Sequence, residues 1–180
     1  MFARLALSAL AAGLTALGCG DYNSPTAPGT SIDSRFTASL AGDAERPTPV
    51  TTTASGTATL STSTRTTTGS SDPYNPSTGG TTSQKTITYS VLVSLLSGPA
   101  TAAHIHGPAD EGNSADAIAS LAITSSAQSG TVVSGSFTAT ANSNVTMDSL
   151  LVLMRNGFAY VDVHTAAHPD GEIRGQIRLP

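Results

Sequence analysis

The C-terminal stretch VDVHTAAHPDGEIRGQIRLP (Val161–Pro180) decides the fold of this chain. Valines alternate with polar residues before Pro169–Gly171, and isoleucines alternate with polar residues after it. Side chains alternate between the two faces of a strand, and Pro-Asp-Gly is strong turn chemistry. The stretch therefore predicts a closing β-hairpin whose Val and Ile side chains face a core. Its polar side chains are expected to form a stripe on the opposite, outward face: Tyr160, Asp162, His164, Glu172, Arg174 and Gln176.

The same alternation recurs upstream of the hairpin. It is clearest in TITYSVLVSLL (86–96) and weaker in several shorter runs. SNVTMDSLLVLMRNG (143–157) differs, because its apolar residues Met147, Leu150, Leu151 and Met154 have helical spacing. Short strands at regular spacing with one short helix are typical of a β-sandwich. We therefore predict a mostly β fold: a single antiparallel β-sandwich of roughly eight strands with Greek-key-like connections and one short helix near residues 146–155.

The N-terminus MFARLALSALAAGLTALGCG is typical of a signal peptide. A short apolar run ends in Gly18 and Cys19, and Ala16–Cys19 resembles a bacterial lipobox. We expect residues 1–18 to be a lipoprotein signal peptide, Cys19 to be lipidated, and residues 19–34 to form a flexible tether. The chain would then be extracytoplasmic and attached through its lipid anchor to the membrane of the cell envelope, the outer membrane in a diderm. An ordinary cleaved signal peptide with an incidental thiol is the alternative.

Charge and composition exclude some classes of function and some structural features. The formal net charge is −4 and there is no basic run, so nucleic-acid binding is not expected. The single cysteine cannot form a disulfide within the chain. The segment 64–85 is rich in Thr, Ser and Gly and almost free of apolar residues, so we expect a long loop insertion between two strands.

All four histidines lie in two short stretches, AAHIHGPA and VDVHTAAHP. His104 and His106 are two residues apart and point to the same side of a strand. Imidazole ligands in this arrangement suit Zn or Cu(II). The candidate metal ligands are His104, His106 and His164, with His168 or Asp162 as the fourth. Whether the stretches meet depends on the strand order, which the pattern does not reveal.

These residues also carry a family resemblance. AAHIHGPA, the later GFAYVDVHTAAHPDGEIRGQI, and the opening FTASLAG, ERPTPV and ASGTATL resemble the CHRD domain, a module named for chordin and common in bacterial secreted proteins. The resemblance covers about residues 36–179 and implies a CHRD domain over residues 35–180. Where this family usually has Asn before Val-His-Thr, the chain has Asp162.

Three functional hypotheses remain open. The first is a non-enzymatic envelope module that binds an unknown protein or matrix partner, with a structural polar network of His104, His106, Asp162, His164, Glu172 and Arg174. The second is an extracytoplasmic domain that binds Zn or Cu and that could take part in redox chemistry. The third, a hydrolase, has the weakest support, because no G-x-S-x-G elbow is present and Ser and Thr are abundant throughout.

Overall fold

The computed structural model describes residues 29–69, 80–139 and 145–180. The expected signal peptide, Cys19 and the first part of the tether lie outside these residues. The described elements are β1 (Gly29–Ala41), the 3-10 turn η1 (Gly42–Ala44), β2 (Ser55–Thr68), β3 (Thr81–Ser94), β4 (Ala100–His106), β5 (Ala117–Ser120), β6 (Gly130–Phe137), α1 (Met147–Arg155), β7 (Tyr160–Thr165) and β8 (Ile173–Gln176). The predicted mostly antiparallel β architecture with one short helix is confirmed.

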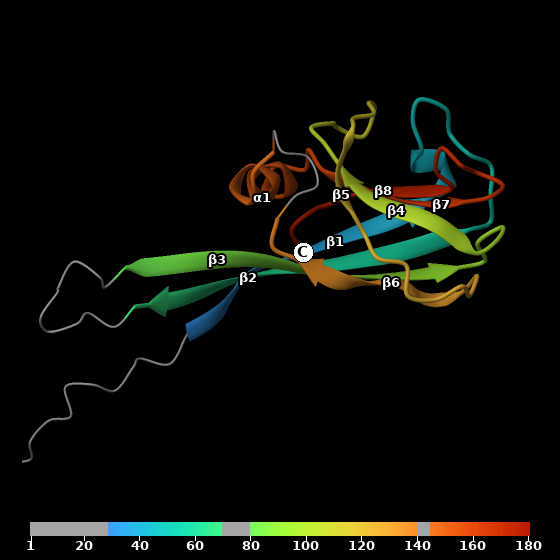
Figure 1. Cartoon of the computed structure of the whole chain (residues 1–180). Helices are drawn as coiled ribbons and strands as arrows, with labels where there is room; N and C mark the ends of the chain where they lie inside the picture. Colours follow the sequence, from blue (N-terminus) through green and yellow to red (C-terminus); the bar gives the residue numbers. More distant parts are fainter. Residues whose placement is uncertain (1–28, 70–79, 140–144) are drawn as a thin grey trace, which may run out of the picture.

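All eight strands belong to one hydrogen-bonded sheet with the order β5-β4-β7-β8-β1-β2-β3-β6. The sheet curls, so that its two halves resemble the layers of a sandwich (Figure 1). An isolated antiparallel bridge between Ile123 and Val133 connects the segment after β5 to β6. The two edges of the sheet are therefore joined at this point, which reduces the exposure of unpaired edge groups.

The core lies inside the curl and is built almost entirely from aliphatic side chains. Phe36, Ile105, Val161, Val163 and Ile173 are all 1% exposed or less. The valines of β7 and the isoleucines at 173 and 177 thus face inward, as their alternation predicts.

The helix α1 forms where its apolar spacing predicts it. The hydroxyl of Thr146 caps its first turn by accepting a hydrogen bond from the Ser149 amide. The helix buries Leu150, Leu151 and Met154 against the sheet and ends before Gly157. No helix among the described residues is long and apolar enough to cross a membrane.

The strands extend further than their apolar residues suggest. β2 continues to Thr68 and β3 begins at Thr81, so both ends of the expected loop at 64–85 are paired as a hairpin. β1 begins at Gly29 and pairs with the same extension, inside the expected tether. Figure 1 shows this ribbon projecting from the body. Thr has a high β-propensity, and backbone pairing between polar strands requires no buried face. Residues 70–79 lie outside the described part of the chain.

Candidate metal centre

The strand order brings the two histidine stretches together. β4 lies beside β7, and His104 is directly opposite Asp162 in the antiparallel register. His106 is opposite Tyr160, and His164 is opposite Ala102. Because alternate residues share a face, the side chains at 104, 106, 162 and 164 all project to one side of the two strands. The four groups therefore converge without any loop having to position them.

Asp162 is the centre of this cluster. Its Oδ2 lies 3.0 Å from Nε2 of His106, and its Oδ1 lies 3.1 Å from Nε2 of His164 and 3.6 Å from Nδ1 of His104. Nδ1 of His104 lies 3.1 Å from Nε2 of His164. One ligand atom from each of the four residues can be chosen so that all lie within 4.8 Å of one another. We call these four residues the His-Asp cluster.

Backbone carbonyls fix the ring orientation of two histidines. Nδ1 of His106 lies 2.8 Å from the Ala115 carbonyl oxygen, and Nδ1 of His164 lies 2.9 Å from the Pro169 carbonyl oxygen. A carbonyl only accepts, so each Nδ1 must carry the hydrogen and donate it. In a neutral ring, Nε2 then has a lone pair directed toward the centre of the cluster.

The cluster also perturbs the pKa values of its members. Burial alone would raise the pKa of Asp162, but the three imidazoles outweigh it and hold that pKa well below the usual range. Contact with Asp162 raises the pKa of His164 to about 9. Burial lowers the pKa of His106, yet Asp162 outweighs burial and the net change is upward. Without a metal, the carboxylate is therefore balanced near neutral pH by the protonated His164 ring.

The donor set fits a transition metal. Tetrahedral ligands with bonds of about 2.0–2.1 Å lie about 3.3–3.4 Å from one another, close to the 3.0–3.6 Å separations around Asp162. His106 Nε2 and Asp162 Oδ1 are buried, and although each lies 3.0–3.1 Å from an atom of the cluster, neither has a hydrogen-bond partner of suitable geometry among the described residues. A cation between them would satisfy both atoms. The side chain of His104 is 25% exposed, compared with 5–14% for the others, so solvent reaches the cluster past His104.

The alternation pattern led us to expect that the polar face of the final hairpin points outward, but in the structure this face is buried. Asp162, His164, Glu172 and Arg174 are all 9% exposed or less. The carbonyls of Asp110 and Asn113 accept hydrogen bonds from Arg174, which places the 107–116 loop over this face. Gln176 donates in the same way to Ala109. Alternation separates two faces of a strand, but it does not reveal that a loop covers the polar one.

Two residues of the expected polar network, Glu172 and Arg174, form their hydrogen bonds with residues outside the His-Asp cluster. The carboxylate of Glu172 accepts hydrogen bonds from the hydroxyls of Thr52, Ser97 and Thr165 and from the Ser97 amide. Burial would raise the pKa of Glu172, but these donors outweigh it and lower that pKa. Glu172 therefore connects the hairpin to the segments before β2 and after β3, and these hydrogen bonds do not involve AAHIHGPA.

Arg174 belongs to a stack of planar side chains. Its guanidinium carbon lies 3.5 Å from the centroid of the Tyr160 ring. The His106 ring is also parallel to Tyr160, with centroids 4.8 Å apart. The Tyr160 hydroxyl donates to the Ala115 carbonyl, the same group that orients His106. Tyr160 thus holds a candidate ligand in place. Its position on the polar face, two residues before Asp162, was the only sequence signal for this role.

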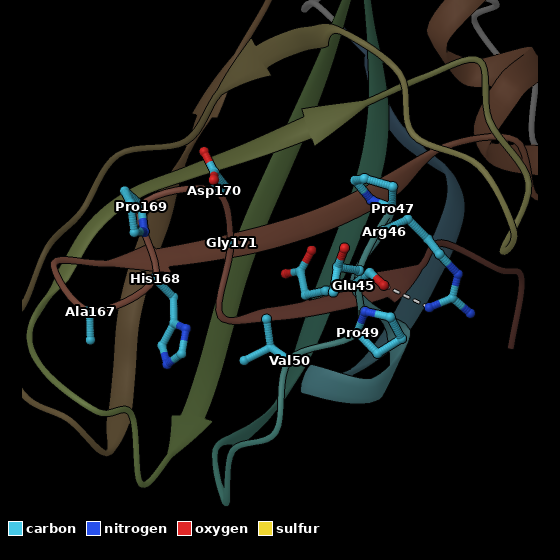
Figure 2. Close-up of a pocket in the computed structure, with 11 residues that line it drawn as sticks. Glu45, Arg46, Pro47, Pro49, Val50, Ala167, His168, Pro169, Asp170 and Gly171 are labelled. Atoms are coloured by element: carbon cyan, nitrogen blue, oxygen red, sulfur yellow. Dashed lines mark hydrogen bonds between the residues drawn. The ribbon is translucent and has the colours of Figure 1, made fainter.

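His168 does not join the His-Asp cluster. It lies in the turn between β7 and β8 and lines a pocket with Glu45, Pro49, Val50 and Asp170 (Figure 2). Glu45 itself is 4% exposed and packs against Gly171. Burial, followed by the charge of Asp162, raises the pKa of Glu45 to about 7. Sequence reasoning missed this second buried carboxyl near the cluster, although it stands in the ERPTPV segment that resembles the family.

The family relationship follows from a direct comparison. A family model described as the CHRD domain matches residues 36–177, which is most of the chain. This protein belongs to the CHRD family. No curated protein and no solved structure matches it. The match includes β4, β7 and β8, so the His-Asp cluster lies within the CHRD domain.

Proposed function

We propose that this CHRD protein is a non-enzymatic, extracytoplasmic module that binds a divalent transition metal, Zn or Cu(II), at the His-Asp cluster. The convergence of four potential ligand atoms within 4.8 Å is the observation that carries the proposal. Three imidazoles with one carboxylate suit Zn and Cu(II) better than Mg or Ca, which prefer oxygen ligands.

Each part of the cluster has a defined role in this proposal. Asp162 supplies the negative charge, and His106 and His164 direct Nε2 inward because Nδ1 of each donates to a carbonyl. Such outer hydrogen bonds set the tautomer and the basicity of a ligating imidazole. His104 is the most exposed of the four side chains and would complete the ligand set on the side nearest solvent. The bound metal would replace the protons that otherwise neutralise Asp162.

A second function remains supported by a specific observation. Protonated His106 and His164 lie at ion-pair distance from Asp162, so the cluster can stabilise the hairpin without any metal. In that case the cluster is a structural network, and the module acts through a protein or matrix partner. The two proposals differ in stoichiometric metal content, which can be measured directly.

The deciding experiment is elemental analysis of protein purified without a His-tag and dialysed against excess Zn or Cu(II). We expect about one ion per chain in the wild type and loss of that ion in the His104→Ala/His164→Ala double variant. His168→Ala is the matched control, because this histidine lies on the same hairpin outside the cluster, and it should retain the ion. A wild type that retains no ion, or equal metal loss in the control, would refute the metal proposal and leave the structural one.

The cellular location remains part of the proposal. The apolar N-terminal run, Gly18 and Cys19 support export and lipidation, and the polar residues after Cys19 support a tether to the membrane. Mass spectrometry of the mature N-terminus should find acylated Cys19. A mature protein that begins at another, unmodified residue would contradict the anchor.

A further inference from the structure

The 107–116 loop joins β4, which ends at His106, to β5. A hydrogen bond from the Gly107 amide to the Asp116 carbonyl closes the base of the loop. Its first residues are fixed to the body, because Ala109 is 6% exposed and its amide is hydrogen bonded to the segment that follows α1. The loop therefore begins directly after a candidate metal ligand and returns to the same edge of the sheet.

The rest of the loop, residues 110–116, is held to the body by polar contacts, and none of its side chains is buried. Arg174 donates hydrogen bonds to the carbonyls of Asp110 and Asn113. The carboxylate of Glu111 forms an exposed ion pair, which contributes little to stability. A segment without buried apolar side chains opens at a lower free energy than the core does. The position of residues 110–116 therefore depends on a small number of hydrogen bonds.

Ala115 is the residue at which this segment meets the His-Asp cluster. Its carbonyl accepts hydrogen bonds from Nδ1 of His106 at 2.8 Å and from the Tyr160 hydroxyl at 3.2 Å. Its amide donates to the same hydroxyl at 3.3 Å. Tyr160 is 4% exposed and its ring stacks on His106, so its hydroxyl has a fixed position. One tyrosine hydroxyl thus contacts both backbone polar groups of the residue that orients a candidate ligand.

These contacts couple the loop to the ligand set. We call the loop seated when they are formed. When residues 110–116 open, His106 loses the carbonyl partner on Nδ1 that directs its Nε2 toward Asp162, and such an outer hydrogen bond sets the orientation and basicity of a ligating imidazole. Coupling between two equilibria is reciprocal. A metal held by Nε2 of His106 therefore stabilises the seated loop by the same free energy as the seated loop adds to metal binding.

We propose that Tyr160 is a positioning residue for the metal centre that acts through Ala115, so that seating of residues 110–116 and metal binding at the His-Asp cluster stabilise each other. The inference rests on the metal binding proposed above. It makes the metal affinity depend on a loop outside the ligand set. In return, metal binding restricts the opening of a segment whose side chains face solvent.

Tyr160→Phe removes the hydroxyl and keeps the ring that stacks on His106. We expect this variant to weaken Zn binding, measured by chelator competition, about tenfold or more. Tyr89→Phe is the matched control, because Tyr89 is also buried and its hydroxyl accepts a hydrogen bond from a backbone amide, that of Ala122, outside the cluster. Both variants should be less stable in urea, but Tyr89→Phe should keep the wild-type Zn affinity, since the protein remains folded in the absence of urea.

Amide hydrogen exchange, followed by NMR, tests the reciprocal half of the inference. In the wild type, added Zn should slow the exchange of the hydrogen-bonded loop amides of Gly112, Asn113 and Ala115 about fivefold or more. The amide of Thr124, which is hydrogen bonded outside the loop, should respond less. In Tyr160→Phe the effect of Zn on the amides of Gly112 and Asn113 should be smaller than in the wild type.

Equal Zn affinity in Tyr160→Phe and the wild type, or the same loss of affinity in both tyrosine variants, would overturn the positioning role. Loop amides that exchange at the same rate with and without Zn would overturn the coupling. Both results require a wild type that binds Zn, so they differ from a failure of the proposed function, in which the wild type retains no ion and this inference is refuted with it.

Discussion

Replacing Asp162 by asparagine removes the charge at the centre of the His-Asp cluster and changes the side-chain shape very little. In the metal-free protein, contact with Asp162 is the largest cause that raises the pKa of His164 from 6.5 to about 9. One pKa unit corresponds to about 1.4 kcal/mol. The His164 side chain is only 11% exposed, so solvent screens this interaction little. The raised pKa of His164, which depends mainly on Asp162, therefore contributes about 2–3 kcal/mol to folding at neutral pH.

The sign of the pH dependence follows from the direction of that shift. The folded pKa of His164 is above its unfolded value, so the stabilisation is present in full below about pH 6.5 and is lost as the pH rises through about 9. We expect the free energy of unfolding of wild-type protein to fall by about 2–3 kcal/mol between about pH 7 and pH 10. In Asp162→Asn most of this decrease should disappear, because the asparagine cannot hold the proton on His164.

Urea denaturation with a metal chelator, repeated across this pH range, measures the effect, and an NMR titration of His164 gives its pKa directly. Asp170→Asn is the matched control, since this carboxylate lies exposed on the same hairpin outside the cluster. The control should keep the wild-type pH dependence. Equal pH dependence in Asp162→Asn and the wild type, or a His164 pKa that stays near 9 in Asp162→Asn, would refute the reasoning.

Three further predictions concern the cluster and its support. His164 must lose its proton before it ligates a metal. The Zn affinity, measured by chelator competition, should therefore rise about tenfold per pH unit between about pH 7 and pH 9. A constant affinity would argue against ligation by His164. Gly171→Ala should lower the free energy of unfolding in urea by about 1–3 kcal/mol, because φ is +123° at this residue and a Cβ would lie 2.6 Å from Oε1 of Glu45. An unchanged midpoint of urea denaturation would contradict that contact. Glu172→Gln should cost about 2–3 kcal/mol in thermal denaturation, since an amide nitrogen would face hydroxyl and amide donors. The stabilisation from Glu172 should be lost as the pH falls below about 4.5, because its folded pKa is lowered, and Glu172→Gln should remove this acid dependence.

The local elements of this protein could be read from the sequence because they depend on neighbouring residues. Alternation alone identifies the inward faces of β3 and β7, and the spacing of Leu150, Leu151 and Met154 identifies α1. The same method underestimated β1, β2 and β3 where they are polar on both sides. A strand of threonines lacks the periodicity that marks a buried face, although its backbone still pairs with a neighbour.

The burial of the polar face could not be predicted in the same way. Asp162 and Arg174 stand at positions that alternate away from the core, and in an isolated hairpin they would meet water. In the folded chain the 107–116 loop forms hydrogen bonds with Arg174, and three histidines surround Asp162, so an apparent surface stripe becomes an interior site. Glu45 was missed for the same reason, because nothing in its own segment indicates which surface will pack over it.

The sequence by itself determined the family, the final hairpin, the short helix and the inventory of titratable groups. Only the tertiary structure decided that β4 lies beside β7, that His104 stands opposite Asp162, and that His168 lies apart from them. Strand order is set by how the whole sheet buries its apolar faces, whereas alternation is set within each strand. The sequence therefore shows that residue types able to ligate a metal are present, but only the fold brings them together as a candidate metal centre.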